Sequence, residues 1–320
     1  MKKKNSIGQI IIKYRIILIL VILAAIFTAL KPVFLNPTNL LNMVKRMSYT
    51  AVCAFGMTFL LTLGVFDMSA GSNAALIGVL LAWALEKGWS VAWVLPAVIL
   101  LAIFFGWLNG FITVKGKIAA FLTTLATMNI YRGIAQTMTE GRTVSIKLKG
   151  LTNFFGNGTF LGIPTPIYIT IIFFAIALFL FYKTKYGFYC RCIGGNEEAA
   201  KVAGIAVDKI KMTAFSAMGF CAGISGLILA SLMNGGMPNL AQDLAMDAIS
   251  ASVLGGTAIS GGLGTMWGTI GGTLIMAIIN TGLSLLGAQT PVQLLVKGFV
   301  IIGAILMDNA LKNRQIVVEE

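Results

Sequence analysis

The stretch "VAWVLPAVILLAIFFGWLNGFIT", residues 91–113, decides the fold class of this chain, because it contains no charged side chain anywhere along its length. A helix of about 20 apolar residues crosses a hydrocarbon layer about 30 Å thick. Within that layer the backbone groups must be satisfied inside the segment itself, which a continuous helix achieves. The stretch is therefore expected to be a membrane-spanning helix.

The overall composition extends this expectation to the whole chain. Hydrophobic residues make up 58% of the 320 residues and charged residues 11%, and the mean hydropathy is +0.90. Soluble domains hold about 45–50% apolar and about 25% charged residues. The composition predicts an all-α integral membrane protein, with residues 1–320 forming a single transmembrane domain.

Ten apolar runs of suitable length predict a polytopic bundle of about ten transmembrane helices. The runs cover residues 16–30, 47–65, 69–85, 91–113, 118–138, 165–182, 212–233, 244–260, 264–286 and 290–308. The segments 67–72 and 260–265 are rich in small residues, so they are either loops or breaks inside membrane-embedded segments. The second interpretation lowers the number of spans to about eight.

The distribution of basic residues predicts the orientation in the membrane. Of the 24 Lys and Arg residues, most fall in the N-terminal segment, the turn 114–117, the loop 183–211 and the C-terminal segment. These segments share one side of the predicted topology, and basic loops face the cytoplasm. We therefore expect both termini and the loop 183–211 to be cytoplasmic in the inner membrane. The net charge of +13 is then a topology signal rather than evidence for a nucleic-acid partner.

The chain lacks the residues that most enzyme mechanisms require. It contains no histidine, so it has no Ser-His pair and no histidine metal ligand. The four cysteines lie in predicted spans or in the cytoplasmic loop, where thiols stay reduced. No phosphate-binding loop occurs, and "ISGGLG" at 259–264 is interpreted as a chance match to a nucleotide-binding signature. No catalytic residue, metal site or cofactor is predicted.

Glycines at helical spacing predict close packing between helices. In the ninth predicted span, Gly264, Gly268 and Gly272 recur every four residues and are expected to share one face. Small residues on one face let a neighbouring backbone approach. Packing without a ligand is the favoured interpretation, and rocking of one helix against another is the alternative.

The polar residues in the predicted spans fall into two groups. The charged residues are expected near span ends, where their side chains can reach the interface: Asp67, Arg132, Asp243, Asp247 and Lys297. The deeper polar residues are neutral: Asn73, Asn109, Thr123, Thr124, Thr127, Asn129 and Asn280. Hydroxyls and amides suit a neutral polyol better than an ion, and interhelical hydrogen bonds are the alternative role for each of them.

The segment "CRCIGGNEEAAKVAGI", residues 190–205, is a polar island that predicts a short helix. Asn196 is a good N-cap, Glu197 and Glu198 fall in the first turn, and Ala199 and Ala200 favour a helix. Gly204 is a natural terminator. So short a helix is unstable alone in water, so we expect it to dock on a partner protein.

The same island begins a wider resemblance. The segments that carry it are "CIGGNEEAAKVAGIAVDKIK" at 192–211, "FDMSAGSNAAL" at 66–76, "NGFITVKGKIAAFLTTLATMNIYRG" at 109–133 and "DAISASVLGGTAISGGLGTMWGTIGG" at 247–272. They resemble permeases of the ribose-type ABC importer family, the branched-chain amino acid/ribose-type binding-protein-dependent permeases. The resemblance extends from about residue 35 to residue 308.

The resemblance implies a type II ABC importer permease with ten helices per subunit and a second permease copy beside it. It also implies a cytoplasmic ABC ATPase subunit, which would dock on the coupling helix 196–204, and an extracytoplasmic sugar-binding protein. By the same analogy, one predicted span lines the translocation path with the side chains of Phe121, Thr123, Thr124, Leu125, Thr127, Met128 and Asn129.

The predicted function is translocation of a ribose-like monosaccharide across the cytoplasmic membrane, with ATP hydrolysis in a separate subunit and membrane lipid around the chain. Another ABC substrate remains open, namely a nucleoside, an autoinducer-like polyol or a branched-chain amino acid. Two alternatives come from other classes. An ion-coupled secondary carrier would use a buried charge relay, and none is evident in the sequence. A membrane scaffold would not need polar side chains in its spans.

Overall fold

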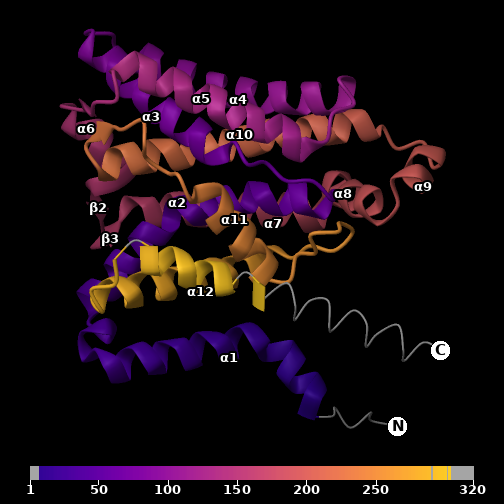
Figure 1. Ribbon diagram of the computed structural model, residues 1–320, viewed down its shortest axis with the longest axis horizontal. Coiled ribbons are helices and arrows are strands. Elements are labelled where there is room, and N and C mark those ends of the chain that lie inside the picture. The colour runs from indigo at the N-terminus through magenta and orange to yellow at the C-terminus, as the bar shows by residue number, and fades with distance from the viewer. Residues whose placement is uncertain (1–6, 290, 301, 304–320) are drawn as a thin grey trace.

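The computed structural model describes residues 7–289, 291–300 and 302–303, and side chains from residue 16 onward. The predicted last span, 290–308, and the basic terminal segments therefore lie partly outside the described residues. Within the described part, the chain is mostly helical (Figure 1).

The helices follow the order of the expected spans with shifted boundaries, but the helix at 244–254 has 11 residues and is much shorter than the expected span 244–260. They are α1 (Ile7–Leu30), α2 (Pro37–Thr62), α3 (Ala70–Glu86), α4 (Val91–Lys115), α5 (Ala120–Thr139), α7 (Thr165–Lys183), α10 (Val207–Leu232), α11 (Leu244–Leu254) and α12 (Met266–Leu285). A further apolar helix covers Pro291–Val300. Among the described residues, α4, α7, α10 and α12 are the four long and apolar enough to cross a membrane by themselves.

Shorter elements connect these helices. They are η1 (Pro32–Leu35), α6 (Lys149–Thr152), η2 (Asn153–Asn157), α8 (Lys185–Gly195) and α9 (Glu197–Val202), with the strands β1 (Val144–Ser145), β2 (Thr159–Phe160), β3 (Ile163–Pro164) and β4 (Gly235–Gly236). β1 pairs antiparallel with β4, with Val144 opposite Gly236, and β2 pairs antiparallel with β3. The helix α8 occupies part of the segment that the sequence predicts as a loop.

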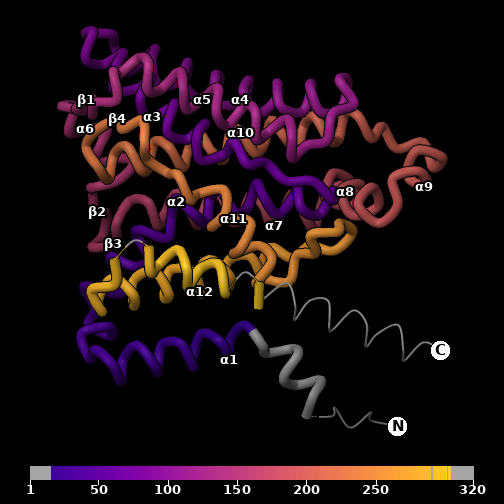
Figure 2. Tube along the Cα trace, viewed as in Figure 1, coloured from indigo at the N-terminus to yellow at the C-terminus, as the bar shows by residue number. Residues whose placement is uncertain are grey.

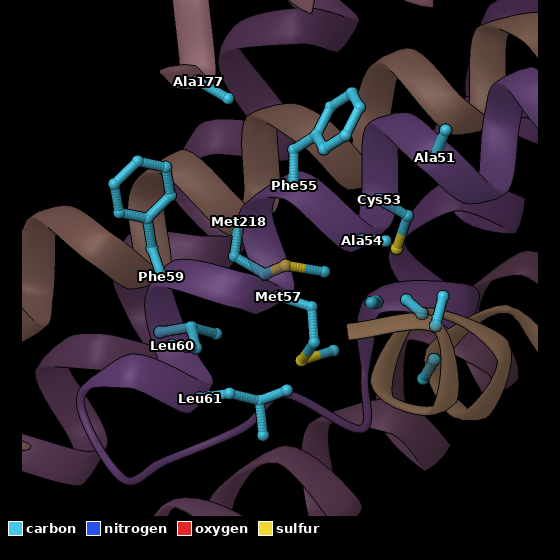
Figure 3. Packing of buried hydrophobic residues seen from close by; sticks show 14 of the residues in the cluster. Ala51, Cys53, Ala54, Phe55, Met57, Phe59, Leu60, Leu61, Ala177 and Met218 are labelled. Carbon is cyan, nitrogen blue, oxygen red and sulfur yellow. The ribbon is translucent and has the colours of Figure 1, made fainter. Parts of the chain in front are cut away.

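The central helix of the bundle is α2, whose residues 50–62 are all buried. It packs against α7, α10, α11 and α12. In Figure 3, Phe55 and Phe59 of α2 lie near Ala177 of α7 and Met218 of α10. The ring of Phe59 also meets the ring of Phe181 at 5.4 Å between centroids. Close packing of these large apolar side chains holds the other helices around α2, because van der Waals contacts drive helix association inside a membrane.

Close helix contacts form where glycines remove the side chain. A Cβ atom at Gly219 of α10 would overlap the carbonyl oxygen of Ala102 in α4. In the same way, Cβ atoms at Gly268 and Gly272 of α12 would overlap the carbonyl oxygens of Gly255 and Ala251. The predicted close approach at Gly268 and Gly272 is therefore made against α11.

Gly264 does not share this face. Thr265 caps α12 by accepting a hydrogen bond from the Gly268 amide at 3.2 Å, so the helix begins only at Met266. Gly264 lies before the helix and faces Thr62 and the ring of Phe181. The expectation of three glycines on one helical face is wrong at this position, because the cap starts the helix two residues later.

The bundle has two distinct ends. The chain leaves α7, forms α8 and α9, and returns into α10, with α9 projecting beyond both helices (Figure 2). We call this the α9 end. The paired strands β2 and β3 and the helix α6 lie at the opposite end (Figure 1). Because α10 runs from the α9 end to the opposite end, its residues show at which end a neighbouring feature lies.

Candidate functional site

The predicted coupling helix is present as α9, and local hydrogen bonds determine both of its ends. The Asn196 side chain accepts a hydrogen bond from the Ala199 amide at 2.9 Å. At the other end Gly204 has a φ of +80°, its amide donates to the Lys201 carbonyl, and the Ile205 amide donates to the Ala200 carbonyl, each at 3.0 Å. This is a Schellman ending, which favours glycine at the left-handed position.

Ion pairs tie α9 to α10. Glu197 lies 2.6 Å from the ammonium of Lys211 and 3.2 Å from that of Lys201, and Glu198 lies 2.8 Å from Lys201. The hydrogen bond from Lys211 is the main cause that holds the pKa of Glu197 below its ordinary value. Each pair is at least partly exposed and adds little stability, so the pairs orient the helix more than they stabilise it.

The outward face of α9 carries an exposed apolar side chain. Val202 is 90% exposed and Glu198 lies beside it in the solvent, whereas Ala200 is buried against the bundle. A short helix fixed at its base and apolar at its tip has the form of a docking element. The contact of α9 with a partner protein stays a prediction.

The helix α8, absent from the sequence prediction, is the rigid base of α9. Arg191 donates a hydrogen bond to the Phe181 carbonyl at 3.0 Å, and its guanidinium lies 5.1 Å from the centre of the Phe181 ring. Cys190 and Ile193 are buried beneath it. The sequence prediction places Arg191 in the loop 183–211. It could not show the hydrogen bond to α7, because the two residues come together only when the chain folds.

Four glycines join the base of α9 to the rest of the bundle, and we call Gly64, Gly194, Gly261 and Gly262 the glycine junction. The Gly262 amide donates to the Thr62 carbonyl at 2.9 Å. A Cβ atom at Gly194 would overlap that same carbonyl, and one at Gly261 would lie 2.8 Å from the Gly194 oxygen. The junction therefore brings α8, the end of α2 and the loop after α11 into backbone contact.

The junction explains the "ISGGLG" motif, which the sequence presents as a chance match. Gly261 and Gly262 have φ values of +87° and +80°, a region that favours glycine. The sequence does show the two glycine pairs, 194–195 and 261–262, and such pairs are typical of places where the backbone makes close contacts. Their contact could not be inferred, because nothing local shows that the two pairs meet.

The seven predicted path residues of α5 lie on two faces of the helix. Thr123, Thr124 and Thr127 are buried inside the subunit, whereas Phe121, Leu125 and Asn129 are exposed and Met128 is half-buried. The structure therefore does not bring the seven residues into one cavity. The exposed members form a stripe along the outside of α5, which we call the α5 stripe.

The buried face of α5 faces a hydrogen-bond network around Asp67. The Asp67 carboxylate accepts hydrogen bonds from the Ser69 amide at 2.8 Å and the Ser69 hydroxyl at 2.7 Å. Asn109 of α4 donates to the Ser69 hydroxyl at 2.8 Å, and Tyr131 of α5 donates to the Asn109 side-chain oxygen at 3.2 Å. The network links α3, α4 and α5, so it positions the α5 stripe.

Two acidic residues are not where the sequence placed them. Asp67 is 2% exposed and Asp247 is 7% exposed, although both were expected to reach the membrane interface. Asp67 is enclosed by hydrogen-bond donors, and Asp247 pairs with Lys297 at 3.0 Å. The expectation was wrong because distance along a span does not determine which helices surround a residue.

Together these features define an integral membrane protein built of packed apolar helices, with a short capped helix projecting at one end. The chain belongs to the family described as the branched-chain amino acid transport system / permease component, whose model matches residues 39–305.

Its relatives are similar over nearly their whole length. The chain is 37% identical to the ribose import permease protein RbsC of Haemophilus influenzae, over 99% of this chain and 100% of that protein. It is 40% identical to RbsC of Bacillus subtilis over 90% of each, and 34% identical to the L-arabinose transport system permease protein AraH of Escherichia coli over 96% and 93%. No solved structure gives a significant match.

Proposed function

We propose that this chain is the permease subunit of an ABC importer that carries a monosaccharide across the cytoplasmic membrane. The observation that carries the proposal is the full-length similarity to permeases named for import of ribose and transport of L-arabinose. In this role the chain performs no catalysis. A cytoplasmic ATPase subunit supplies the energy, and an extracytoplasmic binding protein delivers the sugar.

We further propose the type II arrangement, with one transmembrane domain of ten spans, two permease copies and both termini in the cytoplasm. The basic segments on the α9 side support the orientation. The second copy rests on the similarity to the permease family, and we assign it to the α5 stripe, where Phe121 is 45% exposed in the single chain. The stripe would then line the path between the two copies.

The coupling step would run through α9. The ATPase would bind Val202 and Glu198 at the tip, and its movement would reach α2 and the loop after α11 through α8 and the glycine junction. Backbone contacts transmit displacement well, because no flexible side chain lies between them. The fixed base of α9 supports this route: Arg191 holds α8 to α7, and Lys211 holds Glu197 to α10.

Reconstitution of the purified permease, ATPase and binding protein in vesicles tests the function. We expect uptake of ribose or L-arabinose that requires ATP and continues after ion gradients collapse. A thermal-shift screen of the binding protein separates a sugar from an amino acid substrate. Uphill accumulation by this polypeptide alone, or an immediate stop on loss of the ion gradient, would instead indicate a secondary carrier.

A charge at the tip of α9 tests the coupling helix directly. Val202→Asp places a carboxylate where the ATPase would bury an apolar side chain, so ATPase co-purification and ATP-driven uptake should both fall by about tenfold or more. Because Val202 is 90% exposed, thermal stability of the permease should not change. Lys209→Gln, at an exposed position near α9, is the control, because it lowers the net charge by one unit, as Val202→Asp does.

A further inference from the structure

A cavity of about 550 Å³ lies inside the single subunit, between α2, α11, α12 and the helix Pro291–Val300. Leu229 and Met233, at the far end of α10, line it, so the cavity lies at the end opposite α9. Pockets that hold small molecules have volumes of about 300–1,000 Å³. The cavity is therefore large enough for a small solute.

The charges that line the cavity cancel. Lys297 lies 3.0 Å from Asp247 and 3.7 Å from Asp243, and Arg46 supplies a second positive charge. Two carboxylates and two cations thus line the cavity, of which Arg46 is exposed and Asp243 is half-buried. The pair between Lys297 and Asp247 is largely buried. A ligand with a net charge would disturb this buried pair, which is costly. The charge balance favours a neutral ligand.

The remaining polar lining consists of amides and hydroxyls. It includes Asn39, Asn42, Asn280, Thr281, Ser284 and Gln293. The side-chain oxygen of Asn280 is buried and has no hydrogen-bond partner among the described residues. Such an acceptor is stabilised by a donor from a ligand or water, and a solute hydroxyl can provide one. Several amides beside paired charges match a ligand with many hydroxyl groups.

A single loop separates this cavity from the α5 stripe. Arg132 of α5 donates hydrogen bonds to the carbonyls of Pro238 and Leu240, at 2.5 and 2.7 Å. Leu240 and the residues 241–243 that follow line the cavity on the other side of the loop. The cavity is thus a separate feature from the stripe, and Arg132 of α5 is bonded to the loop that lines the cavity.

We propose that each permease subunit binds a neutral polyhydroxylated solute in this cavity, apart from the α5 stripe. The proposal rests on the proposed function, because it assigns a site for the same class of substrate. A zwitterionic amino acid fits less well, since its two charged groups would have to displace the existing pair between Lys297 and Asp247.

Protection of an introduced cysteine tests the site. Ser284 lines the cavity, and Ser284→Cys changes only one atom type. Cys53, Cys190 and Cys221 are buried, so Cys192→Ser provides a quiet background for a small hydrophilic maleimide. Ser90→Cys is the matched control, because Ser90 is exposed at the same end of the bundle and does not line the cavity.

Ribose or L-arabinose should slow alkylation of Ser284→Cys in the full-length permease and leave Ser90→Cys unaffected. Ser284 is exposed at the open side of the cavity, so protection requires that the bound sugar covers it, and the rate should then fall to about one tenth at a sugar concentration ten times the Kd. Asn280→Leu should raise the sugar concentration needed for half-protection by about tenfold, since it removes the free acceptor. Absence of protection, or equal protection by L-leucine, would overturn the proposal.

Uptake by the reconstituted complex separates this proposal from the proposed function. ATP-driven sugar uptake without protection of Ser284→Cys would refute the cavity site and leave the function standing. Protection without any uptake by the complete complex would support the site and refute the function. Size-exclusion chromatography of each variant establishes that the protein is folded before alkylation is measured.

Discussion

At the α9 end, α2 and the loop after α11 meet through the glycine junction, whereas at the opposite end α2, α11 and α12 surround a cavity of about 550 Å³. The first region contains backbone packed on backbone, and the second contains polar and charged side chains with space between them. The same helices build both ends. The difference shows that side-chain size decides where the helices of this bundle touch through their backbones and where space remains between them.

The largest effect is expected from unpairing the charge at the cavity end. Lys297→Met leaves Asp247, which is 7% exposed, without its cation. Breaking one partner of a buried ion pair costs about 3–5 kcal/mol, so the melting temperature in detergent should fall clearly. The double variant Asp247→Leu with Lys297→Met should recover much of the loss. If Lys297→Met alone and the double variant have the same melting temperature, the ion pair is not buried in the membrane-embedded protein.

The next effect concerns the contact of α11 with α12, which joins the two ends. Gly268→Ala places a Cβ atom on the Gly255 carbonyl, and overpacking of this kind costs about 1–3 kcal/mol. Thermal unfolding in detergent measures the loss. Gly298→Ala is the matched control, because among the described residues its Cβ atom meets nothing within 4 Å. If the two variants unfold at the same temperature, the close contact is absent.

The glycine junction predicts a defect in coupling in addition to a loss of stability, because a Cβ atom at Gly194 overlaps a carbonyl oxygen as closely as one at Gly268 does. Gly194→Ala pushes α8 away from the Thr62 carbonyl, so ATP-driven uptake should fall about tenfold while the protein stays folded, since a step of about 1.4 kcal/mol changes an equilibrium tenfold. Gly195→Ala, at the neighbouring residue with open space around its Cβ atom, should retain uptake. Similar uptake by both variants would remove the junction from the coupling route.

The smallest effect is a pH dependence at α9. Because Lys211 lowers the pKa of Glu197, the ion pair stabilises the fold above the unfolded pKa of about 4.3. That stabilisation is lost as the pH falls through the lower pKa of the folded protein. The side chain of Glu197 is 40% exposed, so the contribution is at most about 0.5 kcal/mol. The protection factors of the α9 amides, which are corrected for the intrinsic pH dependence of exchange, should fall as the pH drops below about 4 in the native chain.

Glu197→Gln should show the same low protection factors on both sides of this pH, because the ion pair is absent throughout. Glu198→Gln serves as the control, since Glu198 pairs only with Lys201 on α9 itself and does not reach α10. A pH response that persists in Glu197→Gln would assign the effect to another carboxylate.

Features that depend on neighbouring residues in the chain were predictable from the sequence. The apolar runs determined the helical membrane class, because a helix satisfies its own backbone wherever it lies. The cap at Asn196 and the ending at Gly204 were predictable for the same reason, since both are made by hydrogen bonds within a few residues.

Features that depend on residues far apart in the chain were decided only by the tertiary structure. Asp247 pairs with Lys297, fifty residues further along the chain. Gly194 contacts Gly262, although nothing in the sequence of either segment indicates this contact. The division of the α5 residues into a buried face and an exposed stripe likewise depends on which helices pack beside α5. Apolar composition places a helix in the membrane, but only the packing of side chains determines its neighbours.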